Sequence, residues 1–288
     1  MSNSVTTSPA DMDDASVSIA VVGRKLPRRG LFFHKNRRLF LGIAGVIVFV
    51  AVWQLLFVVG FLNPVLVGSP AGTLESLVNL LFVKGTIWPD VGASGLEFLL
   101  GFTFGVTIGI VLGLLIGRFR WLDEMSDPLV SAFYATPYVA FLPVIMLTFG
   151  ISLTSKVIIV MWAVFFPVLI NTIAGVKNTP REFLTLSQSF NTSKLRQFTE
   201  ILWPSAIPYV LAGLRQAVGR GLVGVLVAEL FFANNGIGFF ISKASGSYRM
   251  NDAFAAIVIT AVAGVALVRI VGFVENRLAV RWGLSTKG

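Results

Sequence analysis

The sequence contains no cysteine and only one histidine among its 288 residues. A disulfide framework cannot be built, and a metal site made of cysteine and histidine ligands is excluded as well. Charged residues are also scarce, at 13%, whereas 55% of the residues are hydrophobic and the mean hydropathy is +0.82. Because a soluble domain could not solvate so apolar a surface, the composition predicts an all-α integral membrane protein.

Motifs for catalysis and nucleotide binding are missing too. The sequence has no G-x-x-x-x-G-K-[ST] phosphate loop, no nucleophile elbow and no H-E-x-x-H pattern. The GIG run at 236–238 lacks the third glycine and the preceding strand of a dinucleotide fingerprint. We therefore predict no catalytic residue, metal ligand or cofactor in this chain. The net charge of +9 does not indicate nucleic-acid binding, because the basic residues cluster beside hydrophobic segments without a recognition motif.

Long apolar segments divide the chain, and each is long enough to cross a bilayer. We predict six transmembrane helices, at 39–60, 98–117, 128–155, 157–176, 205–232 and 253–274. The rest is predicted to form a largely disordered cytoplasmic tail at 1–38, an external loop at 61–93 and a cytoplasmic tail at 281–288. The last five helices make a core at 94–280, which includes a cytoplasmic loop at 177–204.

Basic residues are distributed unevenly between the predicted loops. If the N-terminus is cytoplasmic, most of the Lys and Arg residues lie on the cytoplasmic side. They are found mainly in the tail at 1–38, in the connection around Arg118 and in the loop at 177–204. Only Lys84, Lys156, Lys243 and Arg249 fall outside. This bias agrees with the positive-inside rule, so we predict that both termini are cytoplasmic.

Glycine recurs at every fourth position of the second predicted span, at Gly101, Gly105, Gly109, Gly113 and Gly117. At about 100° per residue, this spacing places a nearly continuous groove on one helix face. A second helix backbone can approach such a groove closely. Packing inside one subunit and contact between two copies would both use it, and we favour packing inside the subunit.

Prolines interrupt the third predicted span, at Pro128, Pro137 and Pro143. A proline inside a helix removes a backbone hydrogen bond and kinks the helix. A membrane tolerates this where neighbouring helices or a cavity satisfy the freed groups. We therefore predict a broken span near a transport pathway, with Pro137 and Pro143 beside that pathway.

Three charged residues, Arg215, Arg220 and Glu229, lie inside the fifth predicted span. A guanidinium near the middle of a hydrocarbon layer about 30 Å thick is costly unless it is paired or faces water. Two interpretations follow: either arginine lines the pathway and favours an anion, or it pairs with an acidic group on another helix. Glu229 lies too far along the helix axis from Arg215 to pair with it, so both need partners elsewhere.

An amphipathic, charged insert at 179–208 separates the fourth and fifth spans. Thr179, Pro180 and Glu182 have the spacing of a capping box at a helix start. Apolar residues then fall on one helical face and recur after a polar break, at Phe183, Leu186, Phe190, Leu195, Phe198 and Leu202. We predict two short helices joined by a turn, in which Asn191 adopts a left-handed backbone conformation.

This insert resembles the cytoplasmic EAA loop of bacterial ABC importer permeases. The resemblance rests on Glu182-Phe183-Leu184, on Asn191 nine positions after the glutamate, and on Leu202-Trp203-Pro204. Two further stretches, AGLRQAVGRGLVGVLVAEL at 212–230 and ATPYVAFLPVIMLTFGISLTSK at 135–156, are similar to the nitrate, sulfonate and taurine branch of that family. The chain departs from the family pattern where Phe183 and Leu184 replace two alanines and Asn191 replaces the turn glycine.

The resemblance implies a type I ABC importer permease fold with six transmembrane helices in the bacterial inner membrane. It further implies a coupling loop that docks on a separate ATPase subunit, which binds ATP and Mg. The matching positions here are Glu182, Phe183, Leu184, Leu186, Phe190, Asn191, Thr192, Ser193, Phe198 and Pro204. The other implied partners are an external substrate-binding protein, a second permease copy in a homodimer, and membrane lipid.

Permeases of this branch serve sulfonates, taurine, nitrate, bicarbonate and some vitamin-related compounds. The resemblance thus implies a small anionic solute of the sulfonate, taurine or nitrate type, with bicarbonate or a vitamin-related compound as the alternative. A gradient-driven transporter or channel is the rival class of function. Such proteins usually carry internal repeats or intramembrane carboxylates for ion coupling. This sequence shows no repeat and offers only Glu229 as such an acid.

Overall fold

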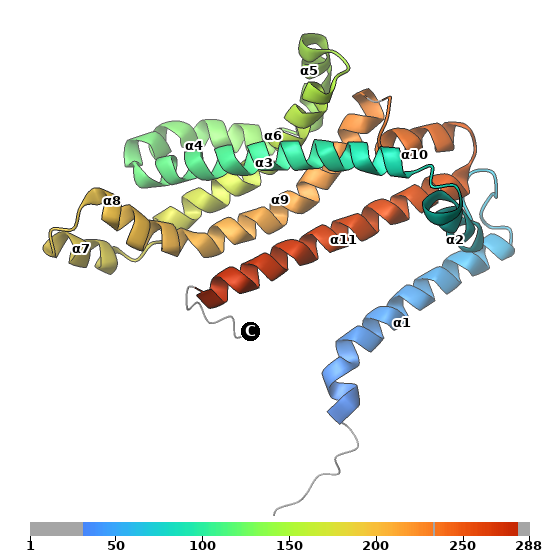
Figure 1. The fold of residues 1–288 in the computed structure, drawn as a ribbon, viewed down its shortest axis with the longest axis horizontal. Coiled ribbons are helices and arrows are strands. Elements are labelled where there is room, and N and C mark those ends of the chain that lie inside the picture. Colours follow the sequence, from blue (N-terminus) through green and yellow to red (C-terminus); the bar gives the residue numbers. More distant parts are fainter. Residues whose placement is uncertain (1–30, 233, 282–288) are drawn as a thin grey trace, which may run out of the picture. The chain divides into compact units, whose positions relative to one another are not determined.

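The computed structural model describes residues 31–232 and 234–281, and all regular elements within these ranges are helices (Figure 1). Five of the described helices are long and apolar enough to span a membrane, and one bent pair of shorter helices is a candidate for a sixth span. The predicted all-helical fold is thus confirmed for the described residues, and the number of candidate spans agrees with the prediction. The predicted tails lie outside the described residues, except for 31–38 and 281.

The chain divides into two compact units, Met1–Ala51 and Val52–Gly288. Helix α1 (Leu31–Val58) crosses this boundary and begins ahead of the predicted start at residue 39. Its stretch Phe40–Val58 has a mean hydropathy of 2.5 and contains no charged residue. A helix that is apolar on all sides is typical of a membrane span.

The second unit continues with α2 (Pro70–Val78), a π-helical turn at Asn79–Val83, and α3 (Trp88–Arg118). A bent segment follows, made of α4 (Arg120–Ala135), a 3-10 turn at Tyr138–Phe141 and α5 (Leu142–Phe149). The remaining elements are α6 (Leu153–Lys177), α7 (Arg181–Ser189), α8 (Lys194–Gln197), a π-helical turn at Phe198–Leu202, α9 (Trp203–Phe232), α10 (Ile237–Gly246) and α11 (Met250–Arg281).

Helices α3, α6 and α9 lie side by side and form the core of this second unit (Figure 1). Aromatic and small or β-branched side chains fill their contact, namely Phe98, Val160, Val164, Val168, Ala217, Val218 and Val225. Because α3 and α6 run in one direction and α9 returns, the beginnings of α3 and α6 meet the end of α9 and the start of α10. We call residues 90–97, 152–156 and 229–238 the α10 end.

The glycine groove of α3 faces α6. A Cβ atom placed on Gly101 would lie 2.5 Å from the Cβ of Val160, and one on Gly113 would lie 2.6 Å from the Cβ of Thr172. The glycines between and beyond them meet Val164, Val168 and Val176 in the same way, at 2.8–3.1 Å. Real Cβ atoms do not approach so closely, so the two backbones can touch only because these positions are glycine. The groove is filled from within the same chain.

Prolines bound the break in the bent segment. Helix α4 ends at Ala135, Thr136 and Pro137 are extended, and the following helical pair turns away by 88°. A residue before proline is pushed out of the helical region, which explains why the helix stops there. Pro143 lies in the first turn of α5, where a missing N–H costs nothing.

Helix α3 starts at Trp88, ten residues ahead of the predicted start at residue 98. The prediction used Glu97 as a boundary, on the assumption that a carboxylate marks the edge of a span. Glu97 is instead buried inside the helical bundle, at 1% exposure. Its charge is accommodated by a lysine on α6, described below.

Candidate functional site

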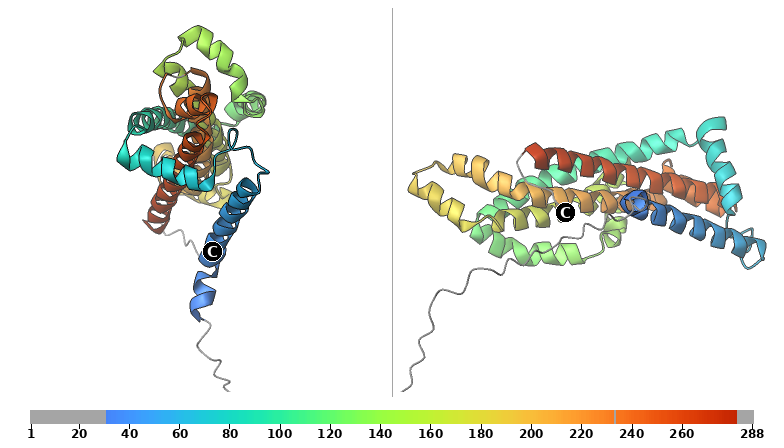
Figure 2. Two further views of the ribbon diagram at one scale, coloured as in Figure 1. Left: turned by 90° about the vertical axis from the view of Figure 1, so that its right-hand side faces the viewer. Right: turned by 90° about the horizontal axis from the view of Figure 1, so that it is seen from below.

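Helices α7 and α8 with the turn at Phe198–Leu202 form a hairpin that projects from the core, at the end opposite the α10 end (Figure 2). The outer side of this α7–α8 hairpin is apolar. Phe183 and Leu186 are 54% and 55% exposed, and Phe190 is 81% exposed. Glu182, in the first turn of α7, is exposed beside them. The hairpin therefore presents hydrophobic side chains in a segment that is otherwise polar.

The predicted capping box at Thr179 is not formed. Pro180 occupies the N-cap position of α7 without a side-chain cap, and the Oγ1 atom of Thr179 is buried without a hydrogen-bond partner among the described residues. The backbone N–H of Thr179 donates to Val176 O, at 3.2 Å. Pro180 has an extended ψ of 126°, so α7 begins at Arg181 and Thr179 lies one residue too early to cap it.

Asn191 ends α7 in the predicted left-handed conformation, with φ of 51°. The N–H of Asn191 donates to Gln188 O at 2.9 Å, and that of Thr192 donates to Ser187 O at 3.0 Å. These two bonds make a Schellman motif, which satisfies carbonyl groups at the helix end. Ser193 then caps α8 by accepting from the N–H of Arg196. Asparagine takes the left-handed position more readily than other residues with a side chain, so the turn forms without glycine.

Two apolar residues of the α7–α8 hairpin point inward. Leu184 and Phe198 are partly buried against Val176, Leu202 and Ala206, which joins the hairpin to the ends of α6 and α9. Pro204 lies in the first turn of α9. The predicted loop residues therefore form two groups, an outward group at Phe183, Leu186 and Phe190 and an inward group at Leu184 and Phe198.

The two arginines of α9 have different partners. Arg215 forms an ion pair with Glu275 of α11. Arg220 donates to the hydroxyl group of Tyr134 on α4, at 2.7 Å, and its guanidinium carbon lies 4.7 Å from the centre of the Tyr134 ring. Tyr134 is three residues before Pro137, at the break between α4 and α5. The structure thus brings Arg220 next to the break, while Pro143 lies on the far side of it.

Glu229 is buried at the α10 end, where three consecutive backbone N–H groups meet side chains of α3 and α9. Gly236 N donates to Asp90 Oδ1 at 2.8 Å, Ile237 N donates to Ser94 Oγ at 2.9 Å, and Gly238 N donates to Glu229 Oε2 at 2.6 Å. The hydroxyl group of Ser94 donates to the other oxygen of Glu229. These N–H groups stand at the start of α10, where the helix dipole also favours negative charge.

Glu97 and Lys156 complete this network. The ammonium group of Lys156 donates to Glu97 Oε1 and, at 3.0 Å, to Asn235 Oδ1. Both charged residues are almost fully buried, and the second oxygen of Glu97 has no hydrogen-bond partner among the described residues. Helices α3 and α6 and the segment before α10 are therefore joined by a buried charge pair and its neighbours.

Sequence reasoning missed this network. The sequence pattern predicts Glu97 and Lys156 as boundaries of spans, and it indicates only an incomplete nucleotide motif at 236–238. Glycine is required at position 236 because a side chain would collide with Glu229. A Cβ on Gly236, where φ is 109°, would lie 2.1 Å from Glu229 Oε1. A glutamate that ends an apolar helix seven residues before a glycine pair was the signal that could have been used.

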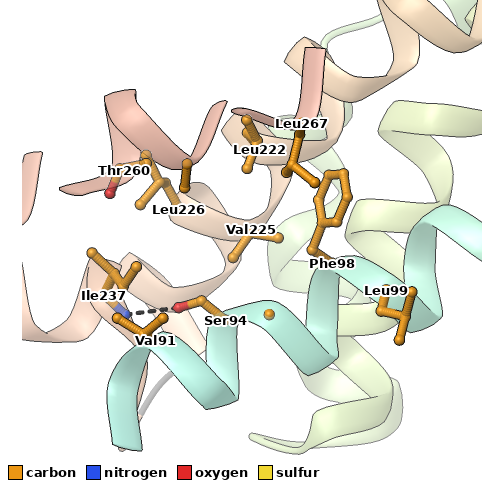
Figure 3. A pocket seen from close by; sticks show the side chains of 12 residues that line it. Val91, Ser94, Phe98, Leu99, Leu222, Val225, Leu226, Ile237, Thr260 and Leu267 are labelled. Atoms are coloured by element: carbon orange, nitrogen blue, oxygen red, sulfur yellow. Dashed lines mark hydrogen bonds between the residues drawn. The ribbon is translucent and has the colours of Figure 1, made fainter. Parts of the chain in front are cut away.

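An apolar cavity of about 320 Å³ lies beside this network, between α3, α9, α10 and α11 (Figure 3). Phe98, Leu222, Val225 and Leu267 line it, and Ser94 reaches its edge while bonded to Ile237 N. A second hollow of about 250 Å³ lies between α4 and α6, lined by the polar residues Asp123, Ser126, Asp127, Ser131, Tyr134 and Lys177 among others. Asp123 and Lys177 are paired there, at 2.7 Å.

Comparison with known proteins identifies the family to which the chain belongs. A family model described as "Binding-protein-dependent transport system inner membrane component" matches residues 105–280. The chain is 33% identical over 233 residues to a putative aliphatic sulfonates transport permease protein of Escherichia coli K12, with 81% of this chain and 88% of the relative covered. It is 28% identical over 259 residues to the taurine transport system permease protein of the same organism, with 88% and 91% covered.

One further relative and one solved structure of similar fold extend the comparison. The riboflavin transport system permease protein of Chloroflexus aurantiacus is 36% identical over 202 residues, with 70% of this chain and 75% of the relative covered. A crystal structure of an amino acid ABC transporter with histidines matches the fold with a TM-score of 0.54 and 17% identity, covering 70% of this chain and 98% of that one.

The family match and these relatives agree with the helical architecture and the absence of catalytic motifs. The family works with an ATPase and a substrate-binding protein, and its members are multi-pass proteins of the inner membrane. This chain therefore belongs to the family of binding-protein-dependent transport system inner membrane components, and it is the non-catalytic permease subunit of an ABC importer.

Proposed function

We propose that two copies of this chain form the route by which a small anionic solute crosses the inner membrane. Each copy would contribute six spans in the type I arrangement, counting the bent α4–α5 pair as one of them. Both termini and the α7–α8 hairpin would be cytoplasmic, in keeping with the distribution of Lys and Arg residues. The α10 end would then face the external binding protein.

The exposed apolar side of the α7–α8 hairpin supports the proposal that the ATPase binds to this hairpin. Phe183, Leu186 and Phe190 would sit in water unless another protein covered them, because the hairpin lies beyond the ends of α6 and α9. An amphipathic helix that presents such residues is typical of helix-in-groove recognition. Leu184 and Phe198, buried against the core, would transmit motion of a docked partner to α6 and α9.

The class of solute is inferred from the relatives and from charge. Relatives of this chain are named for aliphatic sulfonates, taurine, nitrate and bicarbonate, and each of these compounds carries an anionic group at neutral pH. The riboflavin relative indicates that the same scaffold also serves an uncharged vitamin. Arg220, which has no acidic partner among the described residues, favours the anionic class.

Co-purification of the ATPase with the tagged chain tests the docking site. Phe190→Asp should abolish association without changing membrane insertion, because a charge at this position cannot enter an apolar groove. Tyr248→Asp is the matched control: Tyr248 is 66% exposed in the turn between α10 and α11, and its φ of 57° suits aspartate. If Phe190→Asp retains the ATPase as well as the wild type does, the hairpin is not the docking element.

A further inference from the structure

The two arginines of α9 differ in whether their charge is compensated. They are five residues apart, which is about 140° around the helix, so they point to different sides. Arg215 is paired with Glu275 of α11. Arg220 forms no ion pair within the described parts of the chain, and its partner is the uncharged Tyr134. One full positive charge therefore remains on the side of α9 that faces α4.

Arg220 lies deep in the span. It stands twelve residues before the end of α9 at Phe232, which is about 18 Å at 1.5 Å per residue, in a hydrocarbon layer about 30 Å thick. A guanidinium at that depth is not stable against lipid, and it normally faces a water-filled route or other protein. The neighbouring residues agree with this, because Gln216 and Gly219 are also exposed, and a Cβ on Gly219 would meet no atom within 4 Å.

The break between α4 and α5 holds the guanidinium in place. Tyr134 supplies both a hydrogen bond and a ring face, a combination that fixes the position and the plane of an arginine side chain. Tyr138, on the other side of the Thr136–Pro137 break, is close enough to interact with the charge of Arg220. Of the five N–H donors of a guanidinium, one is used by Tyr134, so donors remain for a ligand.

Within the described ranges, no acidic side chain forms an ion pair with this charge. Asp123 is neutralised by Lys177 at the far end of the α4–α6 hollow. Asp127 is exposed, but it lies seven residues before Tyr134, about 10 Å along α4. The field around Arg220 is therefore positive on a polar, open surface in the middle of the span.

We propose that Arg220, positioned by Tyr134, is the anion-recognition residue of the pathway. It would donate two N–H groups to an oxyanion such as a sulfonate or carboxylate, the planar pairing for which guanidinium is suited. The inference rests on the proposed import of an anionic solute, and it assigns that selectivity to one residue and excludes Arg215. Tyr134 acts through Arg220 and is a positioning residue.

A cysteine probe tests the assignment without knowledge of the natural solute. The chain has no native cysteine, so Gln216→Cys introduces a single thiol into it, one turn before Arg220 and about 40° from it around the helix, but about 100° from Arg215. In the assembled transporter, in membranes hydrolysing ATP, this thiol is treated with sulfonatoethyl methanethiosulfonate, an anion, and with the trimethylammonioethyl reagent, a cation. The ratio of the two modification rates, anion over cation, reports the local charge.

We expect Arg220→Gln to lower this ratio by about tenfold, because it removes the positive charge on the helix face that carries the thiol. The double variant Arg215→Gln, Glu275→Gln removes both members of the ion pair and leaves the net charge unchanged, so it should change the ratio by less than about twofold. Arg220→Lys, which keeps the positive charge, should keep the ratio close to that of the parent. A thiol that neither reagent modifies would show that this face is closed to water and would overturn the proposal. A ratio that falls equally in Arg220→Gln and in the double variant Arg215→Gln, Glu275→Gln would overturn it too. Neither result depends on the ATPase co-purification, which tests the permease assembly separately.

Discussion

The α10 end and the α7–α8 hairpin both depart from the usual rule that charged side chains are exposed and apolar ones are buried, each in its own way. At the α10 end, charged side chains are buried: Glu97 and Glu229 are each 1% exposed. In the hairpin, large apolar side chains are exposed, with Phe190 at 81%. The polar groups of the first region find nearly all of their partners within the described chain, whereas the outward apolar side chains of the second, at Phe183, Leu186 and Phe190, stay exposed there.

This difference separates residues that the chain needs for its own fold from residues that it offers to others. A buried carboxylate that loses its partner destabilises the protein that contains it. An exposed phenylalanine contributes little to folding, but it contributes much to an interface that covers it. Substitutions at the two regions should therefore be separable by measuring stability and ATPase association together.

The largest effect is expected from Lys156→Met, which leaves the buried Glu97 carboxylate without its cation. We expect the free energy of unfolding to fall by about 3–5 kcal/mol, measured from the thermal unfolding of the detergent-purified chain. The double variant Lys156→Met, Glu97→Gln should recover most of that loss, because no unpaired charge remains. A single variant as stable as the wild type would show that this pair does not hold the α10 end together.

Gly236→Ala should come next. The added Cβ would lie 2.1 Å from Glu229 Oε1, at a backbone position with φ of 109° that residues with a side chain rarely adopt. A loss of about 2 kcal/mol in the free energy of unfolding is expected. Gly246→Ala is the matched control in the same helix, since a Cβ there meets nothing within 4 Å. Equal thermal stability of the two variants would argue against the described packing around Glu229.

In the hairpin, Asn191→Val tests the turn. A β-branched residue with φ near 51° costs about 1–2 kcal/mol, and this cost should be local to α7 and α8. Limited proteolysis should cut the hairpin faster, while the unfolding temperature of the whole chain changes little. Asn191→Gly should be cut no faster than the wild type; if it is, the left-handed turn is not what holds the hairpin.

The smallest effect on stability is expected from Leu186→Ser, within about 0.5 kcal/mol, because Leu186 is exposed. The same variant should retain less ATPase on purification. Leu184→Ser is its counterpart on the inner side and should lower the unfolding temperature, since Leu184 packs against Val176 and Leu202. Identical behaviour of the two serine variants would remove the distinction between the outward and inward groups.

Features that depend on neighbours in the chain were predictable. The apolar segments indicated the spans, the glycines of α3 indicated a packing face, and the prolines at 137 and 143 indicated a break. The conformation of Asn191 also followed from its place after α7. In each case the cause lies within a few residues, where helix geometry and backbone preferences decide the outcome.

Features that depend on distant residues were not predictable in the same way. Lys156 and Glu97 are 59 positions apart, and Ser94 and Glu229 are 135 positions apart, so no periodic pattern connects them. Thr179 does not cap α7, because Pro180 is extended and α7 begins one residue later than the capping-box spacing predicts. The contrast between Arg215 and Arg220 likewise required the positions of α4 and α11, which bring Tyr134 to one arginine and Glu275 to the other.

Glycine at every fourth position of α3 lets α3 and α6 touch, but this spacing alone does not define the register of the two helices. Groove and ridge have the same spacing, so sliding one helix along the other by four residues, about 6 Å, would set four of the five glycines against another β-branched residue. Such a shift would lose contacts only at the two extremities. Glu97 and Lys156 occur once, and their pairing is satisfied at one setting alone. The buried pair therefore selects one register of α3 against α6 among several that the glycine groove alone would allow.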